Sequence, residues 1–257
     1  MRITLLLTFA SLFNLAQAQS LLSGFSLKHK EKVVAIGGGI DISKEYFIKN
    51  TAVSLTRNIE VIGLYAAYGL KNEWNLVATY TFIDFTPQDI KLGISKAILH
   101  TNKIHLVTGA GLFGPTSNYE TEGLFAAGQQ ARGVWVEQVI QYRHSKYHLD
   151  LALGANVVDA PTPTNFPVSL TFGKSYAKSY LKLFTSYQHG LGNKFYRGVG
   201  EEAPTTFKEL GVTYLKVGGQ FIYTKSSWLP YIGISRTLYG KNAFKATSIS
   251  AGLIKKF

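Results

Sequence analysis

The strongest constraint on the fold is a period of two at the carboxyl-terminal end of the chain. Between 245 and 257 the apolar residues Ile249, Ala251, Leu253 and Phe257 occupy alternate positions, and the residues between them are mostly small or polar. Successive side chains of a strand point to opposite faces of a sheet, so this pattern predicts a strand with one apolar face. A second run of strand length, 228–239, precedes it across a polar turn.

The chain ends on an aromatic residue, which bears on the kind of sheet. A soluble protein gains little from a strand that ends on an exposed Phe, whereas a membrane barrel places such a residue at the membrane interface. The end is similar to the signal that the barrel-assembly machinery reads, with Ser250, Gly252 and Phe257 in place, although Lys255 stands where an apolar or aromatic residue is usual. We therefore expect Gly252 and Phe257 to serve as an assembly signal and the machinery to be a partner during biogenesis.

The amino-terminal end predicts export. Met1-Arg2 is followed by the apolar run 3–15 and by Ala16-Gln17-Ala18, a small-x-small cleavage site. The alternative, a membrane-spanning helix, needs about 20 apolar residues and the run is shorter. We expect a signal peptide over 1–18, cleaved before Gln19, and a single barrel domain over 19–257 in the outer membrane of a Gram-negative bacterium. The chain has no Cys, which excludes disulfides and thiolate metal sites.

Composition agrees with a barrel. Hydrophobic residues make up 46% of the chain, yet no run approaches 18 apolar residues, so they must be dispersed by alternation. The 16 Phe, 15 Tyr and 3 Trp residues are enough for aromatic girdles at the membrane interfaces. A soluble β-sandwich or a lipocalin-like barrel remains the alternative fold.

The pattern predicts an all-β, transmembrane antiparallel β-barrel of about twelve strands. The expected strands are 33–48, 58–70, 74–85, 89–99, 104–113, 132–143, 147–157, 166–173, 179–188, 209–224, 228–239 and 245–257. Gly37-Gly38-Gly39 is expected to form a bulge or kink; if it turns a hairpin instead, the strand number changes, and 10 or 14 are the alternatives. Short connections alternate with longer ones, and the long segments 114–131 and 189–206 both fall on one side, which we expect to be the cell exterior.

One predicted strand shows which face is which. In 148–157, Leu149, Leu151 and Leu153 alternate with His148 and Asp150. A charged side chain facing lipid costs about 2–4 kcal/mol at the bilayer centre, so the row with Asp150 must face the lumen.

A candidate lumen cluster follows from this assignment. A two-residue turn at 145–146 places Arg143 opposite His148 and Gln141 opposite Asp150, with Glu137 farther along the same face. These five residues form either a polar constriction or structural pairs that hold a largely closed barrel. Gln138, on the outward row, has no explanation.

The formal net charge is +12, or +11 once Arg2 leaves with the signal peptide. Export, and the absence of basic clusters with stacking aromatics, argue against nucleic acid. A basic exterior suits contact with anionic lipid headgroups, and solubility is the alternative explanation. The expected partners are outer-membrane lipid, lipopolysaccharide and other outer-membrane proteins.

The sequence contains no signature of catalysis. Gly173-Lys-Ser-Tyr-Ala177 fails the Gly-x-Ser-x-Gly pattern at its last position, and the six His residues show no metal-ligand spacing. We therefore expect no enzyme activity, no cofactor and no metal.

Several segments resemble one family of barrels. They are Leu64-Tyr-Ala-Ala-Tyr-Gly-Leu70 with the turn that follows, Asp89-Ile-Lys-Leu-Gly-Ile94, Gly109-Ala-Gly-Leu-Phe-Gly-Pro115, Leu215-Lys-Val-Gly-Gly-Gln220 and Gly252-Leu-Ile-Lys-Lys-Phe257. The chain resembles outer-membrane transporters of the phenol meta-pathway type, common in Bacteroidota. The resemblance covers most of the mature chain, consists of strand and turn patterns, and implies transport.

The predicted function is a narrow outer-membrane channel or transporter for small molecules, of a hydrophobic or aromatic kind if the resemblance holds. About twelve strands lie between the filled eight-stranded barrel and the open sixteen-stranded porin, so a narrow or plugged lumen is expected. The alternative is an accessory barrel subunit of a larger outer-membrane complex.

Overall fold

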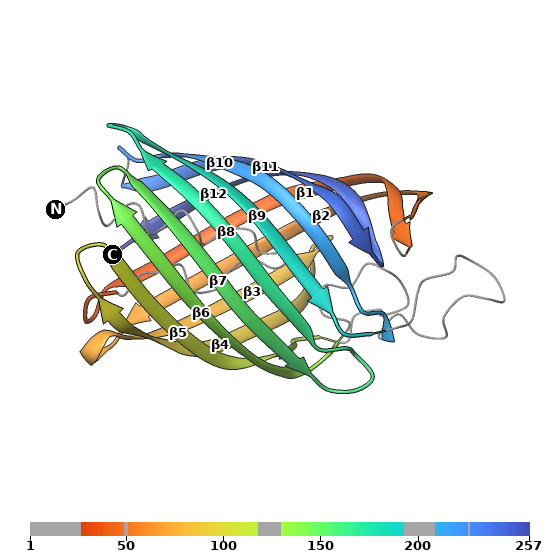
Figure 1. Cartoon of the computed structure of the whole chain (residues 1–257), viewed down its shortest axis with the longest axis horizontal. Coiled ribbons are helices and arrows are strands. Elements are labelled where there is room, and N and C mark those ends of the chain that lie inside the picture. Colours follow the sequence, from red (N-terminus) through yellow and green to blue (C-terminus); the bar gives the residue numbers. More distant parts are fainter. Residues whose placement is uncertain (1–26, 49–50, 118–129, 193–208, 226) are drawn as a thin grey trace.

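The protein is a closed antiparallel β-barrel of twelve strands, in which each strand pairs with its sequence neighbours and β1 pairs with β12 (Figure 1). The computed structural model describes residues 27–48, 51–117, 130–192, 209–225 and 227–257. The strands are β1 Lys32–Ile48, β2 Thr51–Gly69, β3 Trp74–Ile83, β4 Thr86–His100, β5 Ile104–Pro115, β6 Gly133–His144, β7 Tyr147–Val158, β8 Asn165–Ser175, β9 Ser179–Gly190, β10 Thr213–Tyr223, β11 Trp228–Lys241 and β12 Ala243–Lys256. The predicted fold class is confirmed, while the signal peptide 1–18 lies outside the described residues.

The two ends of the barrel differ. The end that we call the turn end carries the short connections after β2, β4, β6, β8 and β10, including the 3-10 turn η2 Lys71–Glu73. The opposite end, the loop end, carries the other connections, and most of the long segments predicted there lie outside the described residues. The carboxyl terminus lies at the turn end, on the left of Figure 1.

The outer wall of the barrel is mostly apolar, as the period of two predicts; Glu60 of β2 and Gln138 of β6 are exposed polar exceptions. On β7, for example, Leu149 and Leu153 are exposed, while His148, Asp150 and Ala152, on the alternate positions, are buried. The same alternation on β6 exposes Val134, Val136, Ile140 and Tyr142. The part of the chain that the structure describes contains no helix long and apolar enough to cross a membrane.

The barrel closes between β1 and β12 over a long register, from Val33 opposite Lys256 to Phe47 opposite Ala243. At the turn end, Lys32 N–H donates to Phe257 O at 3.2 Å and Phe257 N–H donates to Lys32 O at 2.9 Å. The seam therefore has no unpaired strand edge, which a membrane-spanning sheet must avoid.

The glycine run differs from its prediction. Gly37, Gly38 and Gly39 lie inside β1 and pair in unbroken register with both β12 and β2, so they form neither a hairpin nor a bulge. The register shift of β1 lies farther on, after Ser43. A Cβ on Gly39 would lie 2.6 Å from the backbone O of Ile249, which shows that the glycine allows close approach of the two strands.

Two strand boundaries also differ. β2 begins at Thr51 rather than at 58, because Val53 and Leu55 face inward and pack on a cluster around Tyr46. Ser54 and Thr56, which alternate with these two apolar residues, are polar and hide the strand pattern in the sequence. β10 begins at Thr213, later than the predicted 209. Smaller shifts place Pro87 inside β4 and Pro115 at the end of β5, in neither case at a strand centre.

Candidate functional site in the barrel lumen

The candidate site lies on the lumen face of the β6–β7 hairpin. Arg143 pairs with His148 and Gln141 pairs with Asp150, the register expected from the two-residue turn at Ser145-Lys146. Ser145 allows this tight connection by adopting a left-handed backbone, with φ of 53°. The turn places these four residues close to the turn end of the lumen.

The four residues form a packed polar group. His148 Nε2 lies 3.4 Å from Asp150 Oδ2, and Arg143 Nε donates a hydrogen bond to Gln141 Oε1. Gln141, His148 and Asp150 are 1%, 2% and 6% exposed, so solvent barely reaches them. These side chains are packed against one another on the lumen face of the hairpin.

Tyr180 and Lys182, which the sequence analysis did not single out, complete the group from β9. The hydroxyl of Tyr180 lies 2.7 Å from His148 Nε2, and the two rings stack with centroids 5.4 Å apart. Lys182 is 1% exposed and close enough to Asp150 to act on its charge. The signal for Lys182 was its position between outward Leu181 and Leu183, which places it on the lumen row.

Gly173 makes the contact between β7 and β9 possible. It lies on β8 opposite both His148 and Lys182. A Cβ at this position would lie 1.9 Å from the Tyr180 hydroxyl oxygen and 2.1 Å from His148 Cε1. The missing side chain is therefore the space through which Tyr180 reaches His148.

Glu137 does not join the other predicted residues. It faces the lumen on β6, but the buried Val139 lies between it and Gln141 on the same row. Glu137 instead acts electrostatically on Tyr65 of β2 and Lys91 of β4. The structure thus places four of the five predicted residues together and assigns Glu137 to a separate group of charges.

A third charged region lies nearer the loop end. Asp41 of β1 acts electrostatically on both Arg57 and Lys216, and Lys216 Nζ donates to Ser248 Oγ at 3.4 Å. The Arg57 guanidinium also lies 5.1 Å from the ring centroid of Phe244. Charges of both signs therefore line the lumen along most of its length.

An apolar layer fills the lumen on the turn-end side. It consists of inward side chains from every strand except β8, together with Leu27, which precedes β1. Trp135 and Val107 are 2% and 1% exposed, and Leu27 N–H donates to Asn75 Oδ1 at 3.0 Å. At this level, aliphatic and aromatic side chains therefore pack against one another.

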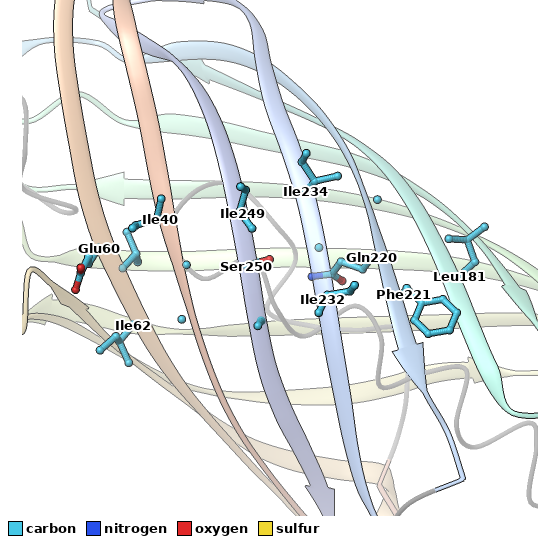
Figure 2. A pocket seen from close by; sticks show the side chains of 16 residues that line it. Ile40, Glu60, Ile62, Leu181, Gln220, Phe221, Ile232, Ile234, Ile249 and Ser250 are labelled. Carbon is cyan, nitrogen blue, oxygen red and sulfur yellow. The ribbon is translucent and has the colours of Figure 1, made fainter.

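A groove of about 900 Å³ lies on the outside of the barrel rather than in the lumen (Figure 2). Ile232, Ile234 and Ile249, which line it, are 64%, 59% and 54% exposed. The groove crosses strands β9 to β2, and the small residues Gly38 and Gly219 deepen it. Because most of its lining belongs to the outer wall, including the exposed Glu60 of β2, the groove is not part of a path through the barrel.

Within the described ranges there is no group of three or more His, Asp or Glu residues that would hold a metal ion. The arrangement places charged side chains of both signs in the lumen.

Comparison with solved structures identifies the architecture. An outer-membrane channel of the COG4313 kind from Pseudomonas putida F1 superposes with a TM-score of 0.70 over 90% of this chain and 97% of that one, at 14% sequence identity. The fold is that of outer-membrane channels.

Two porins support the same architecture at lower similarity. The KdgM porin gives a TM-score of 0.55 at 8% identity over 87% of this chain and 99% of its own, and the NanC porin gives 0.56 at 9% identity over 86% and 98%. No family model and no curated protein matches the chain. The similarity to transporters of the phenol meta-pathway type stays a prediction.

Proposed function

We propose that the protein is a narrow outer-membrane channel for small molecules, with its loop end facing the cell exterior. The observation that carries the proposal is the contrast between the two faces of one sheet. The outer face is mostly apolar, with Glu60 as an exposed charged exception, while the lumen holds charged side chains of both signs, including Asp41, Lys91, Asp150 and Lys182. Ionisable residues inside a membrane-spanning structure are costly and commonly mark a solute or ion pathway.

The lumen group around Asp150 is the proposed constriction. Its mixed charges, Arg143 and Lys182 against Asp150, give a weak electrostatic preference among solutes. Asp150 Oδ1 is buried and accepts no hydrogen bond from the described residues. The competing explanation is that these residues are structural pairs that hold a closed barrel.

The test is the double variant Arg143→Ala with Asp150→Ala, studied by single-channel conductance in a planar bilayer. A constriction predicts a larger conductance, because two long side chains leave the narrowest level. A purely structural role predicts unchanged conductance and a lower unfolding temperature. The matched control is Arg132→Ala with Asp159→Ala, two exposed charges of opposite sign at the loop end, where the backbone N–H of Arg132 donates to Asp159 Oδ1 at 2.7 Å.

The solute class that we propose is small aromatic or hydrophobic molecules. Its support is the apolar character of the lumen layer, to which Trp135, Tyr65 and Tyr231 contribute buried rings, together with the family resemblance. Uptake into protein-loaded vesicles should be faster for a small aromatic acid than for a sugar of equal mass. Equal or reversed rates would contradict this solute class without contradicting a channel.

The proposal includes assembly by the barrel-assembly machinery through Gly252 and Phe257. Phe257 is 63% exposed at the turn end, where a receptor can reach it. Gly252 also has a structural role, because a Cβ there would lie 2.4 Å from Ile36 O and 2.5 Å from Tyr231 Cε1. Removing Phe257 should therefore slow assembly in cells more than refolding into detergent.

An accessory role in a larger complex is the second candidate, and the dense packing of the lumen favours it. Val33, Val139 and Tyr180 are 0%, 1% and 1% exposed, as in a filled barrel. Purification in native lipid separates the two candidates. A stable stoichiometric partner supports the accessory role, and an isolated barrel that conducts supports the channel.

A further inference from the structure

Four lysines at the turn end lie over aromatic rings on the outer wall of the barrel. The pairs are Lys32 with Tyr68, Lys96 with Trp74, Lys174 with Tyr147 and Tyr176, and Lys255 with Trp228 and Phe257. The distances from the ammonium nitrogen to the ring centroids run from 4.8 Å, for Lys255 over Trp228, to 5.9 Å, for Lys32 over Tyr68. We call these ten residues the lysine–aromatic collar.

The collar is built into the strand register. Lys32 lies directly opposite Tyr68, Trp74 opposite Lys96, Tyr147 opposite Lys174 and Trp228 opposite Lys255. Each pair therefore joins two neighbouring strands, β1 with β2, β3 with β4, β7 with β8, and β11 with β12. The sites are distributed around the barrel and do not form a single patch.

The collar lies on the outer wall of the barrel, the same face that carries the exposed apolar side chains. Trp74, Tyr147 and Trp228 are 37%, 41% and 43% exposed on the outward rows. Aromatic residues in such positions lie at the headgroup level of a bilayer. An ammonium held over a ring keeps its N–H donors, because the ring face attracts the charge without accepting those protons as an oxygen would. Lys174 also hydrogen-bonds the hydroxyls of Tyr147 and Tyr176, which leaves one of its three N–H groups. The remaining donors are thus available at the depth of lipid phosphates.

We propose that the lysine–aromatic collar binds the headgroups of anionic glycerophospholipids in the leaflet that contacts the turn end. The charge is complementary, since a cation that also contacts a ring favours an anionic headgroup over a zwitterionic one. A lysine near an anionic membrane surface strengthens binding by about fivefold. The inference rests on the proposed membrane-spanning placement but not on conduction, so the two proposals fail separately.

The protein contains a reporter for this site. Its 3 Trp residues are Trp74 and Trp228, both in the collar, and Trp135, which is 2% exposed in the lumen. In a Trp135→Phe background, quenching of tryptophan fluorescence by acyl-brominated lipid reports contact with the collar. Vesicles of phosphatidylcholine would contain a small fraction of brominated phosphatidylglycerol or, in parallel, the same fraction of brominated phosphatidylcholine.

The expected result is at least a fivefold preference for phosphatidylglycerol, lost when the four collar lysines are changed to Gln. The matched control changes Lys103, Lys146, Lys178 and Lys225 to Gln, because these are exposed lysines in the turns of the same end. The control should keep the preference. Equal loss in both variants would show that net charge alone attracts lipid, and no preference in the starting protein would also overturn the proposal.

A competition arm identifies the source of the phosphate. Unlabelled phosphatidylglycerol should reverse the quenching more effectively than lipid A at equal phosphate concentration. The opposite order would assign the collar to lipopolysaccharide and contradict the proposed ligand. Heat-modifiable migration on gels, measured for every variant, shows that the barrel has folded, and conductance measured on the same samples tests the channel independently.

Discussion

The carboxylate of Glu31 and the ammonium of Lys256 lie 2.8 Å apart where the first and last strands of the barrel meet. Glu31 Oε2 also accepts a hydrogen bond from the backbone N–H of Lys28 at 2.9 Å. Burial raises the pKa of Glu31, but the hydrogen bonds from Lys256 and Lys28 and their charges outweigh it, so the pKa lies below its ordinary value. Folding therefore favours the ionised carboxylate.

Glu31→Gln should lower stability only where Glu31 is ionised. The pKa is lower in the folded state, so the stabilisation is complete above the unfolded pKa of about 4.3 and is lost as the pH falls through the folded pKa. We expect a loss of about 0.2–1 kcal/mol at neutral pH, as for other solvent-accessible pairs, and no loss in strong acid. Urea unfolding in micelles at the two pH values measures both. Equal losses would contradict the role of the pair.

Leu153→Arg should destabilise the barrel in a bilayer by about 2–4 kcal/mol, because it places a charge on the lipid face. Gln138, directly opposite on β6, is exposed on the same face. Gln138→Leu should therefore stabilise the barrel, since an amide in lipid lacks water to bond with. Urea unfolding from phospholipid vesicles measures both changes. Stabilisation by Leu153→Arg would reverse the assignment of the two faces.

Tyr180→Phe should lower the free energy of unfolding by about 0.5–1.5 kcal/mol, because it removes the hydrogen bond at 2.7 Å to the buried His148. Tyr187→Phe is the matched control on the same strand. Its hydroxyl lies 3.4 Å from Nδ1 of His189 in an exposed position, so we expect little change. Similar losses of unfolding free energy for both variants would show that the buried hydrogen bond stabilises the barrel no more than the exposed one.

Single cysteines test the orientation of the barrel. The chain has no Cys, so Ala160→Cys at the loop end and Lys146→Cys at the turn end each introduce one thiol. Both positions are exposed. In intact cells a membrane-impermeant thiol reagent should label the first variant and not the second. Labelling of the Lys146 variant alone would mean that the barrel has the opposite orientation.

Export predicts that the mature protein begins at Gln19 and fractionates with the outer membrane. Amino-terminal sequencing of the membrane-derived protein, with the gel migration of heated and unheated samples, measures both. A soluble periplasmic protein would contradict the outer-membrane assignment.

The sequence predicted much of the fold, because a barrel strand records its two environments in alternate residues. The lipid-facing and lumen-facing rows of β6 and β7 could be predicted, because exchanging the faces of Leu149 and Asp150 would place a charge in lipid at a large cost in free energy. The first part of β2 was not readable, because Ser54 and Thr56 lie outside the apolar belt and give no contrast with water-facing positions.

The candidate site was predictable only within one hairpin. A two-residue turn fixes the register of β6 and β7, so the pairs of Arg143 and Gln141 followed from the sequence. The approach of Tyr180 to His148 depends on the register of β8 with both neighbours and on the space left at Gly173. The separation of Glu137 from the cluster likewise depends on the strands across the lumen.

The pairing of β1 with β12 closes the barrel into a ring, so every strand has two neighbours and none is at an edge. Lys32 and Phe257 exchange two backbone hydrogen bonds, so the two strands meet there as strands do beside a connecting turn. A circular permutant opened at Ser145-Lys146, with a linker joining Phe257 to Lys32, would have the same neighbour on each side of every strand. The architecture therefore depends on the cyclic succession of strands and not on which strand leaves the ribosome first.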